Sequence, residues 1–129
     1  MLTGLVDSLE SKAREYRAIE YDTAIRQTAE KPLNDGTAAA LEEIAARIRQ
    51  IHSEASDPEQ ALATVKTLAE QLEGEVQRAS RQPRDLPDFA AFLLNPMKLL
   101  DSLRDTGRQD GIRHAAELIR KYLNESRSL

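Results

Sequence analysis

The stretch SDPEQALATVKTLAEQLEGEV, residues 56–76, carries the clearest structural signal in the sequence. Asp57 can cap a helix, Pro58 suits the first helical position because it has no N–H to leave unpaired, and Gln60 completes a capping-box spacing. Behind this start, apolar residues fall on one side of a helix: Leu62, Val65, Leu68, Ala69, Leu72 and Val76. We therefore predict an amphipathic helix that runs to about Arg81.

A second amphipathic pattern precedes this helix. It covers about residues 38–55 and follows two candidate capping residues, Asp35 and Thr37. The connection around residues 56–58 is so short that the two helices should be antiparallel neighbours. Residues 38–81 are thus predicted to form a helical hairpin.

The N-terminal segment has two apolar faces. One face is marked by Leu2, Leu5, Leu9 and Tyr16. Beyond residue 19 the apolar side chains move to roughly the opposite side, so either the helix bends there or its two halves pack on different surfaces, one of which belongs to a second copy of the chain. Residues 1–18 are a candidate interaction arm. Lys31-Pro32 is predicted to end the helix, because proline disfavours αR in the residue before it.

The stretch DLPDFAAFLLNPMKLLDSL, residues 85–103, holds both phenylalanines of the chain. Pro87 and Pro96 divide it into two predicted short helices, about 87–94 and 96–105. The first is apolar around its whole circumference and must be covered on every side. We expect this stretch to close one end of the bundle. The alternative is that Leu94 and Leu99, which turn away from the rest of the stretch, contact a second subunit or a partner.

Two glycines, Gly107 and Gly111, are predicted to bracket a turn. The apolar spacing from Ile112 to Leu123 then predicts a final amphipathic helix. No segment alternates with period two over a useful length. We predict an all-α fold: an antiparallel bundle of three to four main helices, with the two short helices closing one end, in a single domain of residues 1–129.

The composition narrows the class of protein. An apolar fraction of 40% and a charged fraction of 31% in 129 residues are typical of one globular domain. The chain has no cysteine, which rules out disulfides, thiol nucleophiles and thiolate metal sites. No apolar run is long enough to span a membrane, and the N-terminal region does not resemble a signal peptide. We expect a cytoplasmic protein with no membrane contact.

No motif for catalysis, cofactor binding or metal binding is evident. The sequence contains no Gly-x-Ser-x-Gly, no phosphate-binding glycine loop and no Glu-x-x-His, and it has only two histidines. We therefore expect no cofactor and no metal. The sequence favours a protein without enzymatic activity, and it leaves open a catalytic site assembled from distant residues.

Charge is unevenly distributed along the chain. Residues 1–76 contain 8 Lys and Arg against 15 Asp and Glu, whereas residues 77–129 contain 10 against 7. Such halves can attract each other within the fold or between subunits, or the basic half can contact an anion. The candidate anion contacts are Arg104, Arg108, Arg113, Arg120 and Lys121. Glu117 lies four residues from both Arg113 and Lys121, which predicts weak surface ion pairs.

These observations favour a non-enzymatic protein-interaction module of a regulatory or accessory kind, which associates with itself. The candidate partner or dimer interface comprises Leu2, Leu5, Leu9, Tyr16, Phe89, Phe92, Leu93, Leu94, Met97 and Leu99. The alternative is a nucleic-acid-associated accessory subunit that contacts backbone phosphates through its arginine-rich C-terminal half. A protein partner, including a second copy of the chain, is favoured over nucleic acid.

Overall fold

The computed structural model describes residues 2–81 and 96–127 of the 129-residue chain. These residues form four helices and no strand, which confirms the predicted all-α bundle. The helices are α1 (Thr3–Arg17), α2 (Ala24–Glu54), α3 (Pro58–Arg81) and α5 (Pro96–Arg127). The predicted short helix over residues 87–94 lies outside the described residues.

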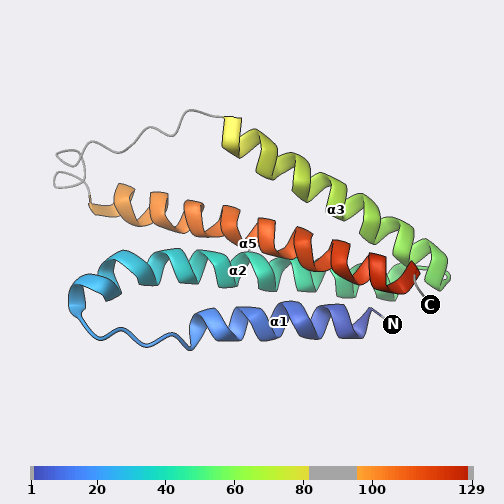
Figure 1. The fold of residues 1–129 in the computed structure, drawn as a ribbon, viewed down its shortest axis with the longest axis horizontal. Helices are drawn as coiled ribbons and strands as arrows, with labels where there is room; N and C mark the ends of the chain where they lie inside the picture. The colour runs from blue at the N-terminus through green and yellow to red at the C-terminus, as the bar shows by residue number, and fades with distance from the viewer. Residues whose placement is uncertain (1, 82–95, 128–129) are drawn as a thin grey trace.

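The centre of the bundle is the pair α2 and α5, which pack most extensively against each other. Both run in the same direction, while α1 and α3 run in the opposite direction (Figure 1). α1 packs mainly on α2 and α3 mainly on α5, and within the described residues α1 and α3 do not touch. Successive helices thus alternate in direction, as in an up-and-down four-helix bundle. In a square bundle α2 and α5 would lie on a diagonal and be separated, whereas here they pack directly against each other.

Glycines allow α2 and α5 to approach this closely. A Cβ atom on Gly36 would overlap the backbone carbonyl oxygen of Arg104, and one on Gly107 would overlap a backbone carbonyl oxygen of α2. A Cβ on Gly111 would lie 2.6 Å from the Thr37 carbonyl oxygen. Because glycine has no side chain, the two backbones can come into direct contact at these positions.

The predicted turn between Gly107 and Gly111 is therefore wrong. α5 is continuous over Pro96–Arg127, so the predicted short helix 96–105 is its first part. Glycine costs only about 1 kcal/mol in a helix interior, and close packing on α2 offsets that cost. The buried Thr37 hydroxyl adds a hydrogen bond across the contact, donating to the Gly107 carbonyl oxygen at 2.8 Å.

The predicted change of apolar face near residue 19 falls at a break between two helices, and the second face is not buried, since Ile25 is 82% exposed. α1 ends at Arg17 and α2 begins at Ala24. Thr23 caps α2, since its hydroxyl oxygen accepts a hydrogen bond from the backbone N–H of Arg26 at 3.1 Å. The chain reverses direction at this break, so α1 and α2 run in opposite directions within one chain.

Pro32 lies inside α2, so the prediction that Lys31-Pro32 ends a helix is wrong. Proline removes one backbone hydrogen bond and crowds the preceding turn, which bends a helix. The first turns of α2 are inclined to the rest of the helix (Figure 1). Pro32 is buried, and this burial offsets part of the cost of keeping proline in the helix.

The predicted start of α3 is confirmed. The helix begins at Pro58, and the Asp57 carboxylate accepts a hydrogen bond from the backbone N–H of Gln60 at 2.8 Å. The Gln60 side chain accepts one from the backbone N–H of Ser56 at 2.7 Å, one residue earlier than a standard capping box. The hairpin connection also has the predicted length, although α3 packs more on α5 than on α2.

Candidate interaction surface

Three residues of the predicted partner interface lie in the core of their own chain. Leu2, Leu5 and Leu9 have exposed fractions of 1%, 2% and 0%. The physical reason is that α1 lies along α2 and places this apolar face against it, instead of extending from the bundle as an arm. These side chains are therefore not on the surface where a partner could contact them.

The other predicted interface residues differ in their positions. Tyr16 is half-buried, with its hydroxyl 3.3 Å from Nε2 of His114, and so links α1 to α5. Met97 is 62% exposed in the first turn of α5. The side chain of Leu99 lies outside the described residues, as do four more residues of the predicted interface: Phe89, Phe92, Leu93 and Leu94.

Large apolar side chains that are exposed within the described part of the chain gather toward one end of the bundle. They are Ile25, 82% exposed, Met97, 62% exposed, and Ile19, 39% exposed. Ile19 precedes α2, Ile25 lies in its first turn and Met97 lies in the first turn of α5. The starts of α2 and α5 lie at the same end of the molecule, at the left in Figure 1.

Two of the predicted anion contacts face carboxylates of the acidic half. Arg108 donates hydrogen bonds to both carboxylate oxygens of Glu43, at 2.6 and 3.3 Å. These hydrogen bonds lower the pKa of Glu43, because they favour its charged form. Arg120 donates from Nε to Glu73 at 2.7 Å and so bridges α5 and α3. The two charged halves of the sequence thus attract each other within the fold, one of the predicted outcomes.

The remaining three predicted anion contacts, Arg104, Arg113 and Lys121, are exposed residues of α5. Arg113 forms an ion pair of 3.0 Å with Asp110, on the same helix, and not with Glu117 as predicted. Arg104 and Lys121 form no ion pair with a residue in the described part of the chain. Lys121 therefore does not pair with Glu117 either, and the predicted surface ion pairs are absent there.

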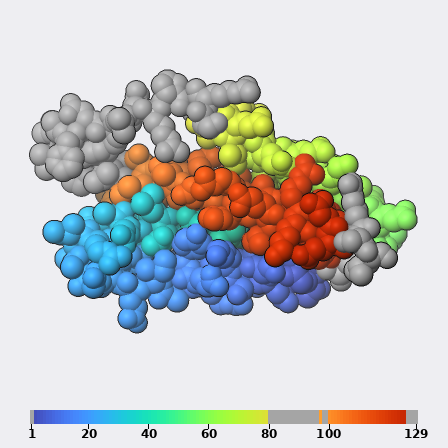
Figure 2. Space-filling model, viewed as in Figure 1, coloured from blue at the N-terminus to red at the C-terminus, as the bar shows by residue number. Residues whose placement is uncertain are grey.

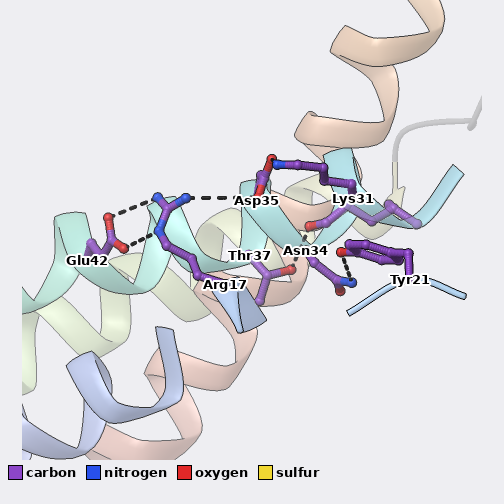
Figure 3. A network of polar contacts seen from close by, with 8 residues as sticks. Arg17, Tyr21, Lys31, Asn34, Asp35, Thr37 and Glu42 are labelled. Carbon is purple, nitrogen blue, oxygen red and sulfur yellow. Dashed lines mark hydrogen bonds and ion pairs between the residues drawn. The ribbon is translucent and has the colours of Figure 1, made fainter. Parts of the chain in front are cut away.

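A charged cleft of about 500 Å³ lies beside the crossing of α2 and α5. Its walls carry three arginines and three aspartates: Arg17, Arg104, Arg108, Asp35, Asp101 and Asp105. Arg17 donates hydrogen bonds to Glu42 at 2.6 and 3.1 Å, and these lower the pKa of Glu42 (Figure 3). Asp35 lies 3.9 Å from Arg17 and pairs with Lys31 at 2.9 Å. Because the opposite charges balance, this cleft has no excess charge that would select an ion.

A larger groove, of about 640 Å³, lies between α3 and α5. Val76 of α3 and Ala116 of α5 give it an apolar lining, and the Arg120–Glu73 ion pair joins its two walls. Figure 2 shows α5, orange to red, at the surface next to the green and yellow α3. The groove is larger than the charged cleft beside Arg17 and has more apolar lining.

A row of charged residues follows α5 along this groove. Arg113, Glu117, Lys121 and Glu125 line it and are all exposed. They are spaced four residues apart, so they lie on one side of the helix, and their charges alternate in sign. Long charged side chains around a small apolar lining are typical of the rim and centre of a protein–protein interface.

Other kinds of site find no support among the described residues. There, no group of three or more His, Asp and Glu side chains is placed to hold a metal ion. None of the described helices is long and apolar enough to cross a membrane.

No protein-family model, curated protein or solved structure matches this chain.

Proposed function

We propose that this protein is a non-enzymatic protein-interaction module of a regulatory or accessory kind, which associates with itself through the groove between α3 and α5. The observation that carries the proposal is the groove itself: about 640 Å³, with Val76 and Ala116 in its lining and a row of exposed charges along it. Burying an apolar lining drives association, and the surrounding charges fix the orientation of the partner.

The way α3 is held supports this assignment. α3 packs mainly on α5, makes few contacts with α2 and none with α1 within the described residues. The second half of α3 therefore lines the groove, and no further helix among the described residues covers that side of it. A helix from a partner fits such a groove, because an amphipathic helix can place its apolar face on the lining.

No specific observation favours the nucleic-acid alternative. Of the five candidate cations, Arg108, Arg113 and Arg120 pair with carboxylates of their own chain. A phosphate would have to compete with those carboxylates for the same guanidinium groups.

Sedimentation velocity over a range of micromolar concentrations tests the proposal. The expected result is a sedimentation coefficient that rises with concentration, together with slower amide hydrogen exchange along α5 near the groove in the associated state. An Ile25→Glu variant is the control, because Ile25 lies at the other exposed apolar surface. A chain that stays monomeric at every concentration overturns the proposal, and loss of association in the control moves the interface to the end of the bundle.

A further inference from the structure

The charges along α5 beside the groove alternate in sign, and this alternation points to a particular kind of partner. Its members are Arg113, Glu117, Lys121 and Glu125, so the signs run plus, minus, plus, minus at four-residue spacing. The row covers twelve residue steps, about 18 Å along the helix at 1.5 Å per residue. A partner helix that presents the opposite order of signs over this length would meet each charge with its complement.

A second copy of the same row, turned antiparallel, presents that opposite order. If the two-fold axis lies level with residue 119, position 113 faces position 125 and position 117 faces position 121, because each pair is centred on 119. Every contact then joins a plus to a minus. In a parallel pairing in register, each charge would face its own copy and like charges would repel.

We propose that the occupant of the α3–α5 groove is a second copy of this chain, with the two α5 helices antiparallel across a two-fold axis near residue 119. This inference rests on the proposed function and names its partner. A two-fold contact is self-complementary, so Glu117 of one copy meets Lys121 of the other, and the reverse contact follows by symmetry. Rows of residues four apart pack side by side when helices cross at about 50°, the commonest crossing angle.

Two charges of the row, those of Glu117 and Lys121, are available for such pairing. Glu117 and Lys121 form no ion pair with any residue in the described part of the chain, although they are four residues apart on one helix. Both line the groove beside Ala116. Packing a second α5 over that lining would displace water from around the charges, which strengthens their attraction relative to a solvated ion pair.

Charge-reversal variants test the proposal. Glu117→Lys and Lys121→Glu each place like charges opposite one another twice in the dimer, so each should weaken self-association by about tenfold or more. Mixed together, the two variants should associate again, because the doubly basic row of one matches the doubly acidic row of the other. The double variant Glu117→Lys, Lys121→Glu should also associate, because both signs are exchanged.

Sedimentation velocity of each variant alone and of the mixture provides the measurement, and circular dichroism checks that each variant stays helical. Rescue by mixing cannot come from an ion pair within one helix, so it supports the contact between chains. Single variants that associate as well as the parent overturn the two-fold pairing and leave the proposed function standing. A mixture that stays monomeric also overturns the pairing, whereas a monomeric parent chain overturns the proposed function itself.

Discussion

α5 makes two contacts of opposite character. Toward α2 it presents glycines, and the two backbones touch at Gly36, Gly107 and Gly111. Beside α3 it lines an open groove with long polar side chains, and the Arg120–Glu73 ion pair joins the two helices across that groove. The first contact excludes water and any further occupant, while the second leaves a recess of about 640 Å³.

The comparison distinguishes a contact that stabilises the fold, between α2 and α5, from a surface that is open to a partner, between α3 and α5. Small side chains favour close packing, because two helix backbones can approach each other and form contacts along the whole crossing when no side chain lies between them. Long charged side chains are favourable beside an open groove, because they remain hydrated in the free protein and can pair with opposite charges when a partner binds. The α2–α5 contact should therefore dominate stability, and the α3–α5 groove should dominate association.

The most severe way to break the α2–α5 contact is Gly107→Ala. The new Cβ would overlap the Leu33 carbonyl oxygen, so the helices must move apart. We expect a loss of about 2 kcal/mol or more in the free energy of unfolding, even after the better helix propensity of alanine. Urea denaturation followed by circular dichroism measures this loss.

Gly74→Ala is the matched control for Gly107→Ala. A Cβ at Gly74 in α3 meets nothing within 4 Å. This substitution should therefore stabilise the protein by roughly 0.5–1 kcal/mol, since glycine is the poorer helix former. Equal effects of the two substitutions would contradict the close contact between α2 and α5.

Removal of the N-terminal cap of α3 tests whether α3 is held less firmly than α2 and α5. Asp57→Ala takes away the acceptor for the Gln60 N–H and should cost about 1 kcal/mol of stability. Hydrogen exchange should accelerate first in the early turns of α3, with α2 and α5 less affected, because α3 has fewer helices packed against it. Asp57→Asn keeps a capping oxygen and should lose much less. A uniform acceleration in all helices would contradict the weaker hold on α3.

A smaller effect concerns the charged edge of the α2–α5 contact. Arg108 lowers the pKa of Glu43 in the folded chain, so the folded state binds this proton at lower pH than the unfolded state. The stabilising contribution is complete above about pH 4.3, the ordinary value for Glu, and is lost as the pH falls through the lowered pKa.

We expect Glu43→Gln to reduce stability at neutral pH by a few tenths to about 1 kcal/mol, as for exposed ion pairs. The same variant should lose less additional stability in acid. Urea denaturation at neutral pH and below pH 4 measures both effects. In an Arg108→Met background Glu43→Gln should no longer alter the acid response, and a persistent effect there would show that Arg108 is not its cause.

Some features of the fold and of the groove could be read from local sequence. Pro58 and Pro96 begin helices as predicted, because a capping residue and a proline act within a few residues of each other. The alternating charges from Arg113 to Glu125 also lie on one exposed side of α5, as their spacing requires. The predicted ion pair between Glu117 and Lys121 within the helix is absent.

Other features depended on neighbours that are distant in sequence. Proline and glycine often mark the ends of helices, but Pro32 lies inside α2 and Gly107 lies inside α5. Glu73 of α3 pairs with Arg120 of α5 across the groove, although the two residues are far apart in sequence. No local pattern could have placed Val76 in the lining of a groove, because the other wall comes from α5.

Local sequence is sufficient to predict that the chain is helical and where several helices begin, because capping and apolar periodicity act over one or two turns. Which helices are continuous and which of them pack together depends on contacts between residues far apart in the chain. Gly36, Gly107 and Gly111 could have been turns, and their role as a backbone contact arises only when α2 and α5 lie together. The tertiary structure also decided which arginines are neutralised, since an ion pair such as Arg108–Glu43 joins residues far apart in sequence.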